Sequence, residues 1–272
     1  MDTTLTDQAR DTEAVRLEVV DGLGIVTLAR PDHGNAIDGE LGAGLTVAVE
    51  RLAAVDGLRA VLVRAEGPTF SLGGDIGYFR SHDPAEYGPV FGRLVDTISP
   101  AVLGLHALEV PVVTAVQGWT VGASLALVGV ADVVVAADDA RFRVAFTGIG
   151  LPGDVGVTWF LPRLVGPRRA AALVLENEPF GAAEALDWGL VSRLVPAADL
   201  QDDALATARR LAAGPTVAFR HARANLASAF DHPLAEHVAA ERASTVDCAT
   251  SHDLIQGIAA FAERRTPEFE GR

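Results

Sequence analysis

The sequence contains no lysine, and its 272 residues include only one cysteine, Cys248, and one methionine. The absence of lysine excludes Schiff-base catalysis and a P-loop nucleotide site, because both need a lysine amine. A single cysteine excludes an intramolecular disulfide and a zinc site built from several cysteines. No histidine has a carboxylate at the spacing of zinc enzymes, so we expect no metal.

Basic charge is also scarce, with 22 arginines against 36 acidic residues and a net charge of −14. This balance argues against nucleic acid or an anionic membrane surface as a partner. Residues 1–18 lack an apolar signal-peptide core, and glycines and Asp132 interrupt the long apolar stretch 120–137. We therefore expect a cytoplasmic protein with no membrane span. The 49% of hydrophobic residues is enough for a large core.

Strand and helix patterns alternate up to about residue 150, and helical patterns follow. This order predicts an α/β protein with a flexible tail (1–14), a core (15–195) and a C-terminal helical module (196–272). The predicted strands are 16–20, 24–29, 59–64, 112–116, 132–137 and 141–144, and the first two form a hairpin with its turn at Asp21 and Gly22. The predicted helices are 38–55, 84–108 (broken at Pro89 and Pro100), 121–130, 155–165, 167–175, 181–187, 200–213, 215–230, 232–247 and 251–264.

Three glycine-rich turns follow predicted strands, at 70–75, 117–124 and 148–156. Two such turns could bring two backbone N–H groups together as an oxyanion hole, although any one of these turns taken alone is better explained as a tight turn. The third turn contains the pattern G-x-G-x-x-G. A dinucleotide site is disfavoured there, because Pro152 lies inside the pattern and the turn does not open a βαβ unit.

Asp154 stands just before the predicted helix 155–165, in an apolar and glycine-rich segment. It could be the N-cap of that helix, a position that aspartate favours. It could also be a desolvated carboxylate that acts as a general base. His82 lies in the polar stretch 80–89, which is a candidate for a mobile lid.

Seven segments together resemble the crotonase (enoyl-CoA hydratase/isomerase) superfamily, and the resemblance covers residues 15–270. The segments are 30–38, 70–75, 118–127, 150–152, 161–166, 185–191 and 261–267. The resemblance implies a spiral of ββα turns with a C-terminal helical trimerisation region, in trimers that often pair into hexamers. It also implies an acyl-CoA thioester as substrate, with coenzyme A as part of that substrate and no separate cofactor.

The resemblance also implies roles for individual residues. The N–H groups of Gly74 and Ala123 would hold the thioester oxygen. Phe261 and Arg264 would reach the coenzyme A of a neighbouring subunit. Further residues would hold the adenine part of coenzyme A, namely His33, Gly34, Ala36, Leu72 and Ile76.

The sequence departs from the hydratases of the superfamily at two positions. Where those enzymes use two glutamates, this chain has Ala126 and Phe146, and neither side chain can activate water or transfer a proton. The segment around Asp154 resembles a subgroup that keeps one aspartate at this place. That subgroup includes the phenylacetate-pathway isomerases, which rearrange a ring epoxide and shift Δ3 double bonds to Δ2. Dehalogenases of the superfamily carry an aspartate there too.

The sequence therefore predicts an acyl-CoA isomerase in which Asp154 moves a proton and the two amides stabilise the enolate. Trp119, Tyr78, Phe79 and residues 80–95 are expected to shape the acyl pocket. Three alternatives remain open: a hydrolase or dehalogenase with Asp154 as nucleophile, a hydratase-like enzyme without the two glutamates, and a non-catalytic acyl-CoA binder.

Overall fold

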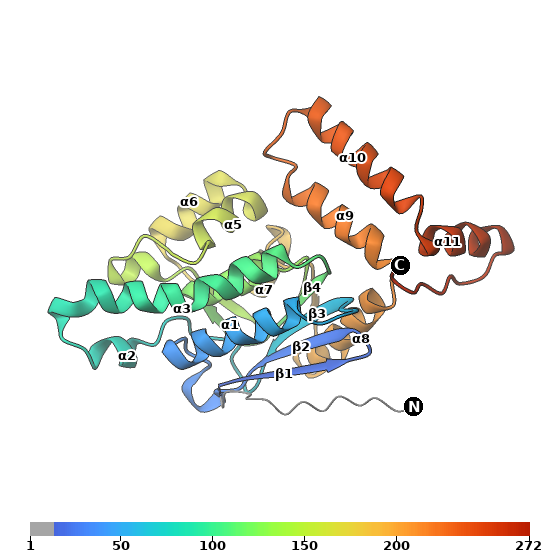
Figure 1. Cartoon of the computed structure of the whole chain (residues 1–272). Coiled ribbons are helices and arrows are strands. Elements are labelled where there is room, and N and C mark those ends of the chain that lie inside the picture. The colour runs from blue at the N-terminus through green and yellow to red at the C-terminus, as the bar shows by residue number, and fades with distance from the viewer. Residues whose placement is uncertain (1–13) are drawn as a thin grey trace.

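The computed structural model describes residues 14–272 (Figure 1). Residues 1–13, most of the expected tail, lie outside the described residues. Ala14 is fully buried, and its carbonyl accepts a hydrogen bond from the Ala29 N–H at 2.9 Å. Position 14 therefore belongs to the folded core and not to the tail.

The centre of the fold is a six-stranded sheet in the order β1-β2-β3-β4-β6-β9. Its strands are β1 (Val15–Val20), β2 (Leu23–Leu28), β3 (Ala60–Ala65), β4 (Val112–Val116), β6 (Val133–Ala137) and β9 (Arg193–Val195). Only β1 and β2 pair antiparallel, which confirms the predicted hairpin, and the other neighbours are parallel. Asp21 and Gly22 have φ of 51° and 75°, as a two-residue hairpin turn requires.

A second sheet has three short strands in the order β5-β7-β8. They are β5 (Trp119–Val121), β7 (Arg141–Arg143) and β8 (Phe180–Gly181). The sequence pattern predicts β7 alone, because strands of two or three residues leave no readable alternation. The helix expected from Val121 begins later, since residue 121 still pairs with Arg143 in this sheet.

Helices cover the main sheet and extend beyond it. Their bounds are α1 (Gly39–Ala53), α2 (Ile76–Arg80), α3 (Tyr87–Ala107), α4 (Leu125–Gly129), α5 (Val157–Val165), α6 (Pro167–Glu176), α7 (Ala182–Asp187), α8 (Leu200–Ala212), α9 (Thr216–Ala227), α10 (Leu234–Cys248) and α11 (His252–Glu263). Helix α1 packs on α3 and contacts β1 and β2, whereas α8 contacts β3, β4 and β6. All residues of β2 and β4 are buried, so the core lies on both faces of the sheet.

Helix α3 is continuous, and the predicted breaks at Pro89 and Pro100 are wrong. Pro89 lies in the first turn, where a backbone N–H has no helical partner to lose. Pro100 has no N–H to donate to the carbonyl of Asp96 four residues earlier, so one interior hydrogen bond of the helix is lost. Burial of one face of α3 against α1 keeps the helix intact across the proline.

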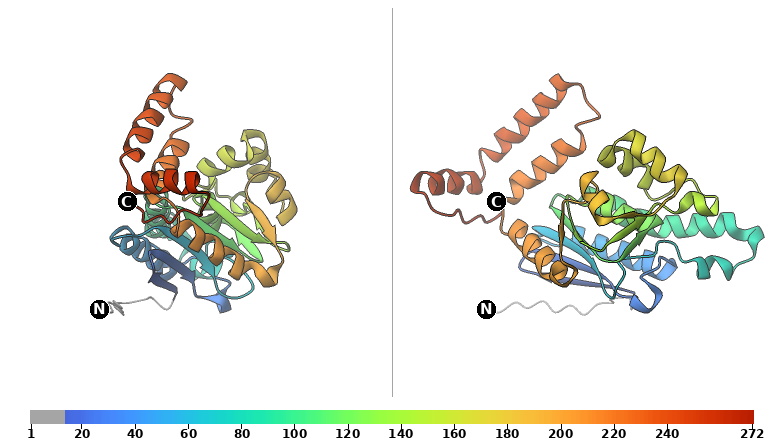
Figure 2. Two further views of the ribbon diagram at one scale, coloured as in Figure 1. Left: turned by 90° about the vertical axis from the view of Figure 1, so that its right-hand side faces the viewer. Right: turned by 180° about the vertical axis from the view of Figure 1, so that it is seen from behind.

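Helices α9, α10 and α11 extend away from the sheet (Figures 1 and 2), and α9 and α10 bury none of their residues. Helix α8, in contrast, packs on the sheet. The described chain thus places α8 with the core layers and α9 to α11 outside them. The division of the chain at residues 195 and 196 stays a prediction.

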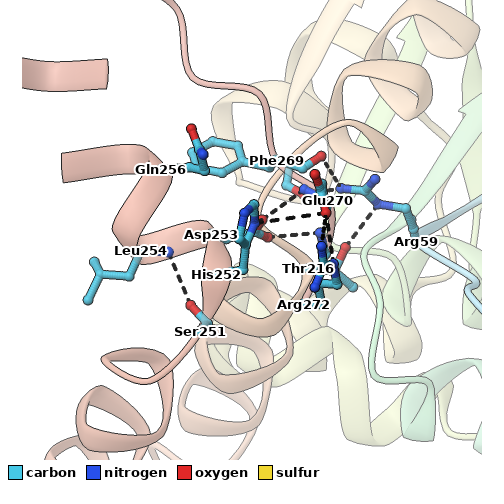
Figure 3. Close-up of polar contacts among 12 residues, drawn as sticks. Arg59, Thr216, Ser251, His252, Asp253, Leu254, Gln256, Phe269, Glu270 and Arg272 are labelled. Carbon is cyan, nitrogen blue, oxygen red and sulfur yellow. Dashed lines mark hydrogen bonds and ion pairs between the residues drawn. The ribbon is translucent and has the colours of Figure 1, made fainter. Parts of the chain in front are cut away.

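The C-terminal segment 265–272 ties α11 to the core (Figure 3). Asp253, which is 2% exposed, accepts the N–H groups of Glu270 and Gly271 at 2.8 and 2.9 Å. Arg59, just before β3, donates to the carbonyls of Gly214 and Phe269 at 2.7 and 3.1 Å. These bonds fix the position of α11 although it has few packing neighbours.

Candidate active site

Two loops that follow β3 and β4 pair side by side like short strands. Phe70 N–H donates to the carbonyl of Gln117 at 2.8 Å, and Ser71 N–H donates to that of Trp119 at 3.1 Å. The Val121 N–H in turn donates to the Ser71 carbonyl at 3.0 Å. This pairing fixes the register between the first two glycine-rich turns.

Glycines allow these loops to touch along their backbones. Gly73 has φ of 75°, and a Cβ at this position would lie 2.3 Å from the carbonyl oxygen of Val121. Gly118 has φ of 53°, and its Cβ would lie 2.0 Å from the carbonyl oxygen of Pro68. Real Cβ atoms cannot come so close to backbone oxygens, so both positions require glycine.

The pairing leaves the amides of Gly74 and Ala123 directed away from their own loops. The Ile37 N–H donates to the carbonyl of Gly73, and the Ile37 carbonyl accepts the N–H of Asp75. In such a parallel bridge, the N–H of the residue between them, Gly74, points away from Ile37. Ala123 is the second residue of a short 3-10 helix (Gly122–Ser124), where N–H groups have no helical partner. Both residues line one cavity.

This cavity has a volume of about 280 Å³ and is largely apolar. One wall comes from α2 and α3, through Phe79, Phe91, Leu94, Val95 and Ile98. Phe79 and part of the stretch 80–95, which were expected to shape the acyl pocket, therefore line this cavity. Trp119, Tyr78 and His82 do not line it. The His82 ring packs on Tyr78, with Nδ1 2.9 Å from that residue's carbonyl oxygen.

Asp154 lines the cavity and has no hydrogen-bond or ion-pair partner among residues 14–272. Its Oδ1 atom is buried and has no hydrogen bond, and burial raises the pKa of the carboxyl from 3.8 to about 6. The N-cap interpretation is wrong, because α5 begins after Gly156 and has no side-chain cap. The next residue, Val155, has φ of 40°, a costly conformation for a β-branched residue.

The positions of the two missing glutamates are apolar in the structure. Phe146 lines the cavity, and its ring lies 3.9 Å from where a Cβ on Gly153 would stand, next to Asp154. Ala126 is completely buried in α4. Asp154 is thus the only carboxylate among the residues that line the cavity. A lone, desolvated carboxylate beside two open amides can remove and return a proton with little competition from water.

The residues expected to contact coenzyme A fall into two groups. Leu72 and Ile76 lie at the cavity with 45% and 50% of their surface exposed. Gly34 accepts the Leu72 N–H at 3.0 Å, which places the loop of His33 and Ala36 beside them. Phe261 and Arg264 lie at α11, at the opposite end of the molecule from α2 (Figure 1). Within one chain they do not reach the cavity.

Two polar residues of the cavity wall were not predicted from sequence, Arg143 at the end of β7 and Asn177 after α6. The sequence offers no signal for Arg143, because an exposed strand arginine is common. Asn177 has φ of 56° and ends α6. An asparagine just after a helical pattern is a recognised end signal, although it does not indicate a cavity.

Within residues 14–272, no group of three or more His, Cys, Asp or Glu side chains is placed to hold a metal ion. No helix of the same range combines the length and apolarity that crossing a bilayer requires.

Fold and site define a crotonase-type protein, and comparisons with known proteins agree. The family model described as Enoyl-CoA hydratase/isomerase matches residues 18–272. A crystal structure from Mycobacterium abscessus, assigned to the enoyl-CoA hydratase/isomerase group, is similar with a TM-score of 0.91 and 34% identity. It covers 95% of this chain and 100% of that one. The chain belongs to the enoyl-CoA hydratase/isomerase family.

Relatives within the family carry different activities in their names. A probable enoyl-CoA hydratase of Rhodobacter capsulatus is 36% identical, covering 95% of this chain and 98% of that protein. The 1,2-epoxyphenylacetyl-CoA isomerase of Escherichia coli is 33% identical, covering 96% and 99%. The 4-chlorobenzoyl coenzyme A dehalogenase-1 of Arthrobacter is 35% identical, covering 74% and 73%. Family membership alone therefore leaves hydration, isomerisation and dehalogenation as possible reactions.

Proposed function

We propose that the protein is an acyl-CoA isomerase that moves a Δ3 double bond to Δ2. The observation that carries this proposal is Asp154, a single unpartnered carboxylate in an apolar cavity that two backbone amides also line. A double-bond shift needs one base that removes a proton at C2 and returns it at C4. Hydration needs a second group to activate water, and Ala126 and Phe146 cannot supply it.

The proposed mechanism gives each part of the site one task. The amides of Gly74 and Ala123 bind the thioester oxygen and stabilise the negative charge that develops on it in the enolate. Asp154 takes the C2 proton and then donates it to C4 of the dienolate. The apolar wall, with Phe146 beside the carboxyl, keeps water from the intermediate. Leu72, Ile76 and the loop of His33, Gly34 and Ala36 bind the coenzyme A part.

The test is an assay of the purified protein with 3-enoyl-CoA in deuterium oxide. We expect 2-enoyl-CoA as product, in which deuterium at C4 reports exchange of the shuttled proton with solvent. Formation of 3-hydroxyacyl-CoA would contradict the proposal and indicate a hydratase. Binding of CoA thioesters without turnover would contradict it as well and indicate a silent binder.

A dehalogenase with a nucleophilic Asp154 is the second candidate. It is favoured by the dehalogenase relative and by the same free carboxylate. Attack on 4-chlorobenzoyl-CoA would form an aryl ester of Asp154 and release chloride, and water would then hydrolyse the ester. In ¹⁸O-labelled water, this route places label in Asp154 after repeated turnover. Mass spectrometry of the peptide that contains Asp154 distinguishes the two candidates.

The activity should depend on pH through Asp154. The base must be ionised to accept a proton, and burial raises its pKa to about 6. We expect kcat/KM to be constant above pH 7 and to fall about tenfold per pH unit well below pH 6. An ordinary aspartate would keep full activity down to about pH 5. A profile that stays flat to pH 4.5 would contradict the role of this carboxyl.

We further propose that α9 to α11 form the contacts of a homotrimer, alone or paired into a hexamer. Large apolar side chains stand exposed along these helices and the turn between α9 and α10, namely Leu226, Phe230, Leu234, Ile255, Ile258 and Phe261, which is 88% exposed. Such a surface is costly in water unless a partner covers it. Assembly would also let Phe261 and Arg264 reach the coenzyme A of a neighbour.

Light scattering should report three or six times the chain mass. Leu234→Glu should shift the protein toward monomers, because it places a charge in the proposed contact. Leu175→Glu on α6 is the matched control, since Leu175 is equally exposed but lies outside these helices. A monomeric wild type, or equal effects of the two variants, would refute the interface.

A further inference from the structure

Apart from Asp154, the cavity lining contains two polar side chains, Arg143 and Asn177, and each has hydrogen-bond donors left free among the described residues. Arg143 and Asp154 are the only ionisable residues among those that line the cavity. The proposed reaction uses Asp154 and gives Arg143 no task. A cationic side chain on an otherwise apolar wall indicates that the ligand carries a complementary group.

Arg143 is anchored by one nitrogen and free at the others. Its Nε donates to the backbone carbonyl of Asn177 at 2.9 Å. None of the ion pairs within residues 14–272 includes this guanidinium. The single bond orients the planar group and leaves both terminal nitrogens available to a ligand.

Asn177 presents a second donor on the same wall. Its side chain is buried, and its Oδ1 accepts the N–H of Ala145 at 2.7 Å. This bond determines which amide atom is the oxygen, so Nδ2 is the remaining donor. Nδ2 has no acceptor among the described residues. It lies 2.5 Å from where a Cβ on Gly148 would stand, so glycine leaves the space over this donor open.

The donors form a place distinct from the catalytic carboxyl. Among residues 14–272, no ion pair joins Arg143 to Asp154, although both residues line the same cavity. Arg143 therefore does not act as the counter-ion of Asp154. A ligand that reaches both must span the cavity between them.

We propose that Arg143 and Asn177 bind a carboxylate at the far end of the acyl chain, so that the preferred substrates are monothioesters of dicarboxylic acids. This proposal rests on the proposed function, in that the cavity accepts the acyl part of an acyl-CoA. A guanidinium with two free nitrogens matches the two oxygens of a carboxylate, and the amide adds a third donor. The apolar wall of α2 and α3 suits the methylene groups between thioester and carboxylate.

The test uses saturated thioesters, which bind but cannot be isomerised. Calorimetry compares butanedioyl-, hexanedioyl-, octanedioyl- and decanedioyl-CoA with the monocarboxylic acyl-CoA of equal length. At the length that spans the cavity, we expect the dicarboxylic ligand to bind roughly tenfold more tightly to the wild type. Arg143→Gln should reduce this preference to less than about threefold.

Arg141→Gln is the matched control. Arg141 lies two residues earlier on the same face of β7, is equally exposed, and does not line the cavity. It should keep the full preference. Three results would overturn the proposal: no preference at any length, equal losses in both variants, or equally tight binding of the neutral ω-hydroxyacyl-CoA. Binding of these ligands needs no turnover. If the protein prefers the dicarboxylic ligand but does not isomerise 3-enoyl-CoA, the isomerase proposal is refuted and the carboxylate-binding proposal stands.

Discussion

Asp154→Asn should lower kcat/KM for 3-enoyl-CoA by about 10²- to 10⁴-fold, the range that a general base contributes. Asparagine keeps the shape of the side chain and removes its ability to accept and return a proton. The substitution also replaces a partly desolvated carboxyl by a neutral amide, so the fold should not suffer. Steady-state kinetics with calorimetry of thioester binding measures both consequences, and we expect binding to persist.

Asp139→Asn provides the control for the loss of one negative charge. Asp139 is exposed in the turn between β6 and β7, away from the cavity. It should have wild-type kinetics. If Asp154→Asn retained more than a tenth of the activity, the single-base mechanism would be wrong. If it abolished thioester binding as well, its effect could not be assigned to proton transfer.

Gly73→Ala should reduce kcat/KM by about 10²- to 10³-fold, comparable to the loss of one oxyanion donor. The added Cβ would lie 2.3 Å from the carbonyl oxygen of Val121, so the two paired loops must separate. Separation moves the Gly74 amide relative to the Ala123 amide. The chemistry should suffer more than binding, because the two amides matter most when charge develops on the thioester oxygen.

Gly57→Ala is the control that separates the effect of the Cβ clash from the effect of backbone strain. Gly57 has φ of 76°, almost the same as Gly73, and a Cβ there would meet nothing within 4 Å. In both variants an alanine must adopt the left-handed conformation, which lowers the free energy of unfolding by about 1–2 kcal/mol. Only Gly73→Ala should lose activity, and its Tm should fall further. Equal kinetics in the two variants would show that the close approach of the loops does not position the amides.

Local patterns were sufficient for the elements that flank the site. The hairpin at Asp21 and Gly22, the buried strands β3 and β4, and the glycine-rich turns after them follow from short-range composition. Turn chemistry and strand burial act over a few residues, so the sequence carries their signal directly. Helix α3 is a counterexample, because packing on α1 overrides Pro100.

The sequence by itself determined the order of strands and helices, the three glycine-rich turns that follow strands, and the aspartate in the third of these turns. Only the tertiary structure decided what that aspartate is. Asp154 is buried in a cavity whose apolar lining comes from segments far apart in the sequence. It does not cap α5, because Val155 and Gly156 adopt left-handed conformations and the helix begins after them. Arg143 and Asn177 likewise meet only when β7 and the end of α6 pack together. Burial and convergence depend on contacts between distant segments, and no local pattern encodes them.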